Sequence, residues 1–77
     1  MIYLTDKEIG QIIKKKRLER KLTQTELGRY LNVQAAAINK YESGLVSNIK
    51  RDKLKQLSII LDIEPSVLIG VVNNEKS

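Results

Sequence analysis

Apolar residues recur three or four positions apart along most of this chain of 77 residues. That spacing puts them on one face of an α-helix, whereas the strict alternation of a half-buried strand is absent. Turn-forming residues divide the pattern into short segments. We expect one domain over 1–72 and a disordered tail over 73–77. The pattern predicts a compact all-α fold with five helices, at about 6–20, 24–31, 35–43, 49–61 and 65–70.

Two capping boxes indicate where the first two helices begin. Thr5 stands three residues before Glu8, so their side chains can satisfy free backbone N–H groups at a helix start. Thr23 and Glu26 repeat this spacing. Gly44 is expected to end the third helix, because glycine adopts the left-handed conformation of many helix C-termini without strain.

The most constrained stretch runs from 23 to 44. Gly28 lies inside a predicted helix, where glycine costs about 1 kcal/mol relative to alanine, so we expect a close helix contact there. Asn32 falls between two helices, where a turn needs positive φ and asparagine tolerates it. Two short helices joined in this way form a helix-turn-helix, which reads DNA with its second helix. Their inward sides are expected to carry Leu27, Leu31, Val33, Ile38 and Tyr41.

Charge and composition narrow the functional classes. The chain has 14 Lys and Arg against 9 Asp and Glu, a net charge of +5, which suits a polyanionic partner. It has no His and no Cys, so the commonest general base and the usual zinc ligands are missing. We therefore expect no enzymatic activity, metal site, cofactor or small-molecule ligand. No apolar run reaches the roughly 18 residues of a membrane span, so we expect a cytoplasmic, nucleoid-associated protein.

The chain resembles the lambda-repressor-like family of helix-turn-helix proteins, also called the Cro or xenobiotic-response-element type. The resemblance covers about 9–70. It rests on IIKKKRLERKLTQTEL at 12–27, YLNV at 30–33, INKYESG at 38–44 and LSIILDIEPSVLIG at 57–70. The segments NKYESG and NIKRDKL are most similar to repressors of temperate phages and mobile elements. The resemblance implies a five-helix domain that binds inverted-repeat operators as a dimer.

The resemblance also implies roles for single residues. Arg17 and Glu42 match an internal salt bridge, and Gln24 matches a glutamine that contacts a phosphate. Alanines stand where the family usually has long polar base-readers. An alanine methyl can contact thymine, and Asn and Gln suit adenine, so we expect a thymine/adenine-rich half-site. The expected base-reading residues are Gln34, Ala35, Ala36, Asn39 and Lys40.

Phosphate contacts are expected at the start of the second helix and between the third and fourth helices. Lys50 and Arg51 stand in the first turn of the predicted fourth helix, where the helix dipole disfavours cations, which suggests another role. Asn48 is expected to cap that helix and also to contact a phosphate. The lysines at 14–16 are expected to form a solvated face instead. The full expected set is Thr23, Gln24, Ser43, Asn48, Lys50 and Arg51.

Several apolar residues have no place in the predicted core, and we expect them to form a symmetric dimer interface. The alternative is that they pack on their own domain. The set is Ile59, Ile60, Val67, Ile69, Val71 and Val72.

These patterns favour a sequence-specific regulator of transcription that binds double-stranded DNA, most simply a repressor. The alternative is a protein-interaction module on the same fold, such as an antitoxin-like or antirepressor-binding subunit, which the alanine-rich third helix keeps open. A peripheral membrane or nonspecific polyanion binder would rest on net charge alone and would leave Gly28 and Asn32 unexplained.

Overall fold

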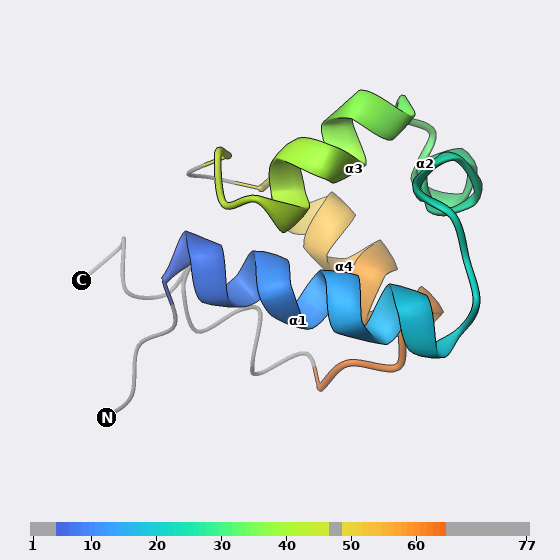
Figure 1. Ribbon diagram of the computed structural model, residues 1–77, viewed down its shortest axis with the longest axis horizontal. Coiled ribbons are helices and arrows are strands. Elements are labelled where there is room, and N and C mark those ends of the chain that lie inside the picture. Colours follow the sequence, from blue (N-terminus) through green and yellow to red (C-terminus); the bar gives the residue numbers. More distant parts are fainter. Residues whose placement is uncertain (1–4, 47–48, 65–77) are drawn as a thin grey trace.

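The computed structural model describes residues 5–46 and 49–64. Within these residues the chain forms helices and no strand, so the all-α prediction is confirmed for this part. Figure 1 shows α1 running beneath α3, with α2 seen end on beside them and α4 behind. The helix predicted over 65–70 and the tail over 73–77 lie outside the described residues. The helices are α1 (Asp6–Glu19), α2 (Gln24–Leu31), α3 (Ala35–Glu42) and α4 (Arg51–Ile60).

The first two helices begin with capping boxes. Thr5 Oγ1 accepts a hydrogen bond from the Glu8 N–H at 3.1 Å, and the Thr5 N–H donates to Glu8 Oε1 at 2.9 Å. Thr23 and Glu26 form the same pair of bonds at the start of α2, at 3.0 and 2.8 Å. Each box satisfies backbone N–H groups that have no partner inside the helix.

The start of α4 differs from the prediction. The expected N-cap was Asn48, but α4 begins at Arg51 and its N-cap is Lys50, whose side chain makes no capping hydrogen bond. Leu54 and Leu57 are buried against the rest of the domain, and an earlier helix start would leave them on the same face. The local preference of asparagine for a cap position therefore does not by itself decide where a helix begins.

One hydrophobic core joins all four helices and the segment that follows α4. Each of its side chains gains about 1.5–3 kcal/mol from burial, which makes this core the main source of stability. Ile60 packs against the core from its edge, and its expected place in a dimer interface stays a prediction. The core residues are Ile9, Ile13, Leu27, Leu31, Ile38, Leu54, Leu57, Leu61 and Ile63.

Two glycines allow helices to approach closely. A Cβ on Gly28 would lie 2.6 Å from the carbonyl oxygen of Val33, on the far side of the turn after α2. The turn itself passes through Asn32, which has φ 60° and ψ 42°. Gly10 was not singled out from the sequence, yet its Cβ would overlap the backbone carbonyl of Tyr41 and lie 2.5 Å from that of Glu42. Gly10 is therefore where α1 crosses α3.

Candidate nucleic-acid interface

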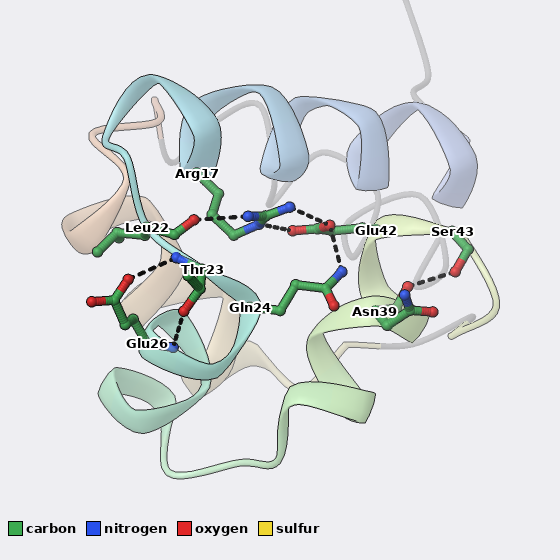
Figure 2. A network of polar contacts seen from close by, with 8 residues as sticks. All are labelled: Arg17, Leu22, Thr23, Gln24, Glu26, Asn39, Glu42 and Ser43. Atoms are coloured by element: carbon green, nitrogen blue, oxygen red, sulfur yellow. Dashed lines mark hydrogen bonds and ion pairs between the residues drawn. The ribbon is translucent and has the colours of Figure 1, made fainter.

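A buried ion pair holds α1 against α3. Arg17 Nε donates to Glu42 Oε2 at 2.6 Å, and Arg17 Nη2 donates to Glu42 Oε1 at 3.2 Å. Both residues are buried, with 7% and 8% of their surfaces exposed. Arg17 Nη1 also donates to the carbonyl oxygen of Leu22 at 2.7 Å, in the loop before α2 (Figure 2). Such a pair is stable in a protein interior only when its remaining polar atoms are also satisfied, as they are here.

Gln24 extends this network to α2. Its Nε2 donates to Glu42 Oε1 at 3.1 Å, so the Glu42 carboxylate joins three helices (Figure 2). A carboxylate only accepts hydrogen bonds, which requires the amide nitrogen of Gln24 to face it. The expected phosphate ligand Gln24 thus has one N–H engaged inside the domain and one left for another partner.

The outer face of α3 carries the expected base-reading residues. The side chains of Ala36, Asn39 and Lys40 are exposed, whereas Ala35 is half-buried. Gln34 is the N-cap of α3, with no side-chain capping bond, so its amide is not needed for the helix start. These residues form a surface of small and polar groups, with a single positive charge.

Lys14 lies beside this face, although it was expected to be part of a solvated charge run. It lines a hollow of about 130 Å³ together with Gln24, Asn39, Glu42 and Ser43. Helix spacing alone would not have found it, because the crossing of α1 and α3 also decides which residues border this hollow. Positions 10, 14 and 17 share one face of α1, and Gly10 and Arg17 both contact α3.

The hydroxyl groups expected at phosphates have partners within the chain. Ser43 Oγ donates to the carbonyl oxygen of Asn39 at 2.5 Å, so its proton is engaged. Thr23 Oγ1 accepts from the Glu26 N–H within the capping box. The hydrogen bonds from Thr23, first from its backbone N–H and then from its side chain, hold the pKa of Glu26 below its ordinary value.

The cations at the start of α4 are open to solvent. Lys50 and Arg51 are both exposed. Asn48, which was expected to act with them, lies outside the described residues. Tyr41 packs against the core from α3; its burial raises the pKa of its phenol, and the nearby charge of Asp52 on α4 adds a smaller effect in the same direction. Tyr41 therefore stays neutral at physiological pH.

The expected dimer residues are only partly within the described chain. Ile59 is 71% exposed, whereas Ile60 packs on the core. The other four lie outside the described residues: Val67, Ile69, Val71 and Val72.

No other chemistry emerges from the residues that the structure describes. Within 5–46 and 49–64, no group of three or more His, Cys, Asp or Glu is arranged to hold a metal ion. None of the four helices there is both long enough and apolar enough to cross a membrane.

The chain is similar in sequence to helix-turn-helix proteins. A family model described as helix-turn-helix matches residues 13–68. Over 61 residues, or 79% of its length, the chain is 36% identical to an uncharacterized HTH-type transcriptional regulator, y4wC, of Sinorhizobium fredii. The chain spans 42% of the length of that relative. No solved structure gives a significant match.

Proposed function

The chain belongs to the helix-turn-helix family, as its resemblance to lambda-repressor-like proteins implied, and from this premise we propose that it is a sequence-specific, double-stranded DNA-binding regulator of transcription. One observation carries the proposal. The turn at Asn32 and the close contact at Gly28 set α2 against α3, and the outward residues of α3, Ala36, Asn39 and Lys40, are exposed. The relative from Sinorhizobium fredii, which is named a transcriptional regulator, supports it.

In this proposal α3 enters the major groove and reads bases. Asn39 and Gln34 suit adenine, whose N6 and N7 form a donor and acceptor pair, and Lys40 suits guanine. The methyl group of Ala36 contacts the methyl group of thymine. A half-site rich in thymine and adenine is the expected target.

Backbone contacts come from the two ends of this surface. Lys50 and Arg51 at the start of α4 supply charge to one phosphate region, while Gln24 and Thr23 lie at the start of α2. Helix N-termini attract anions through their free N–H groups and dipole, which adds to the side-chain contacts at α2. Such contacts set the register of the protein on DNA but carry little sequence information.

We further propose that the protein is a repressor that binds an inverted repeat as a dimer. Two copies would read half-sites about one helical turn, or roughly 34 Å, apart. Occupation of a promoter is enough for repression and needs no chemistry. The exposed side chain of Ile59 supports an apolar contact between copies.

A protein-interaction module on the same fold is the second candidate. Leu45 and Ile59 are 73% and 71% exposed. Exposed apolar side chains mark an interaction site when they gather into one patch. In this case a protein partner would cover these side chains, and DNA binding would be secondary.

Selection of bound duplexes from a random DNA library, at near-physiological salt, tests the proposal. Recovery of an inverted repeat supports a dimeric operator-binding regulator, and its half-site tests the expected thymine/adenine preference. Recovery of a single half-site supports DNA reading without the dimer. If folded protein selects no motif, the DNA-reading proposal is wrong and the interaction module gains support.

A further inference from the structure

Lys53 makes a contact that its place in a basic run does not suggest. Its Nζ lies 2.6 Å from the carbonyl oxygen of Leu31, the last residue of α2. Lys53 is half-buried, whereas its neighbours Lys50 and Arg51 are exposed. A lysine in a basic run is usually solvated or binds a phosphate. This one is directed into the domain.

The contact completes the end of α2. The last carbonyl groups of a helix lack donors within it and need partners from elsewhere. Asn32 N–H donates to the carbonyl oxygen of Arg29 at 3.2 Å, and Val33 N–H donates to that of Gly28 at 2.8 Å. Leu31 receives its donor from Lys53, on a different helix. A cation at a helix C-terminus is also favoured by the helix dipole.

The same bond ties α4 to the helix-turn-helix. Within the described residues, the bond from Lys53 to Leu31 is the side-chain hydrogen bond that links α4 with α2 or α3. The main packing of α4 is on α2, and α2 in turn packs on α3. The position of α4 relative to the base-reading face is therefore transmitted chiefly through α2.

We propose that Lys53 is a positioning residue for DNA binding. By tying the first turn of α4 to the end of α2, it holds Lys50 and Arg51 in register with α3. The proposal rests on the DNA-binding function proposed above. Base contacts and phosphate contacts form together only when their spacing matches the duplex, so a displaced α4 would weaken binding without the loss of a DNA contact.

Salt-dependent binding separates this role from that of a phosphate ligand. Binding to a duplex carrying the selected site, or to a random-sequence duplex if none is found, is compared for wild type, Lys53→Met, Lys50→Ala and Lys55→Met. Lys53→Met keeps the unbranched stem, and we expect about fivefold weaker binding with an unchanged salt slope. Lys50→Ala should reduce the slope by about 0.9. Lys55→Met removes the same charge from an exposed site on α4 and should change affinity less than about twofold.

Coupling between Lys53 and Lys50 gives a second readout. If Lys53 acts through Lys50, then Lys50→Ala should weaken binding less in the Lys53→Met background than in the wild type. A role confined to stability would leave the two effects additive. A slope reduced by about 0.9 in Lys53→Met would make Lys53 a phosphate ligand and overturn the proposal. Unchanged affinity in that variant would overturn it as well.

The orientation of α4 relative to α2 and α3 is also measured without DNA, from residual dipolar couplings of backbone N–H groups. One alignment tensor should fit α2, α3 and α4 in the wild type, and α4 should depart from it in Lys53→Met. An unmoved α4 contradicts the inference. Absence of duplex binding by the wild type would instead refute the proposed function itself. Should Lys53→Met lose its helical circular dichroism, Lys53→Gln, which keeps a shorter donor, takes its place in both measurements.

Discussion

The outer face of α3 and the start of α4 both belong to the proposed DNA-binding surface, but they are held in different ways. Three features fix α3: the close crossing at Gly10, the buried pair of Arg17 and Glu42, and the bond from Gln24. The start of α4 has no side-chain cap, and Lys53 supplies its hydrogen bond to α2.

This difference matches the tasks proposed for the two regions. A hydrogen bond to a base edge needs its side chain within a few tenths of an ångström of the right place. A lysine or arginine on a long stem can follow a phosphate over a larger range. The contacts agree with these tasks: α3, which is proposed to read bases, is held firmly, and the start of α4, which is proposed to bind phosphates, is held by fewer contacts.

Removal of one partner of the buried pair should have the largest effect. Glu42→Leu leaves the Arg17 charge buried without its carboxylate and should lower the free energy of unfolding by about 3–5 kcal/mol. The double variant Arg17→Met/Glu42→Leu should be more stable than Glu42→Leu alone, because no unpaired charge remains. Urea unfolding measures both. A loss below about 1 kcal/mol for Glu42→Leu would mean that this pair does not hold α3.

The crossing at Gly10 should be nearly as sensitive. Its Cβ would lie 2.5 Å from the carbonyl oxygen of Glu42, and a backbone carbonyl cannot move without shifting α3. Gly10→Ala should therefore destabilise the protein by about 2–3 kcal/mol, although alanine favours helix. Gln11→Ala, at the exposed neighbouring position, is the control and should be nearly neutral. Thermal unfolding of both variants decides whether α1 and α3 touch at this point.

Gly10 also shows what the sequence could and could not predict. Gly28 and Asn32 stand next to a turn, where local rules predict a close contact and positive φ, and both features are present. Gly10 lies inside an amphipathic helix, and no local rule says which helix will cross there. The start of α4 was also misplaced. Asn48 offered a good cap, but the helix begins at Arg51, and the buried Leu54 and Leu57 would share one face with either start.

Lys53 was missed because charge runs do not reveal which cation turns inward, and Lys14 because an exposed lysine can still border a hollow. The four-residue spacing of Ile9 and Ile13 in α1 is typical of one helix face, and both are buried in the core. That spacing could not show that Lys14 borders the hollow between α1 and α3, since that depends on how the helices cross. Composition and local pattern thus predict elements and core positions. Contacts between elements require the packed structure.

Substitutions on the two regions should change DNA binding in different ways. Asn39→Ala on α3 should reduce discrimination at one base pair by about 1–3 kcal/mol. Lys50→Ala at α4 should weaken binding almost equally for all sequences and lower the salt slope by about 0.9. Competition binding with a set of single-base operator variants measures both. The reverse pattern would exchange the roles assigned to α3 and α4.

Amide hydrogen exchange compares the two helix starts at matched positions. At the start of α2, the Leu27 N–H donates to the carbonyl oxygen of Thr23 at 3.0 Å, and the side chain of Thr23 caps the helix. At the start of α4, the Leu54 N–H donates to the carbonyl oxygen of Lys50 at 2.9 Å, and the side chain of Lys50 makes no capping bond. We expect the opening free energy to be about 1 kcal/mol lower at Leu54, because a side-chain cap contributes about that much. Lys50→Ser, which introduces a cap, should reduce the difference. Equal protection in the wild type would remove the contrast between the two helices.

The smallest effect is expected at the exposed capping box of α2, where the contribution should depend on pH. Hydrogen bonds from Thr23 hold the pKa of Glu26 below its ordinary value of 4.5. The unfolded chain therefore binds a proton at a higher pH than the folded chain does. The contribution of the charged carboxylate is complete above the unfolded pKa and is lost as pH falls through the lower folded pKa.

Glu26→Gln keeps an oxygen for the Thr23 N–H but removes the charge. The wild type should be the more stable protein near neutral pH, and the two unfolding free energies should converge below the ordinary glutamate pKa. Glu64→Gln removes a charge from an exposed side chain and is the control for net charge. A difference between Glu26→Gln and wild type that persists unchanged to about pH 3 would show that hydrogen-bond geometry alone, without charge, makes this cap effective. In that case the firm hold on α2 and α3 would come entirely from their buried contacts.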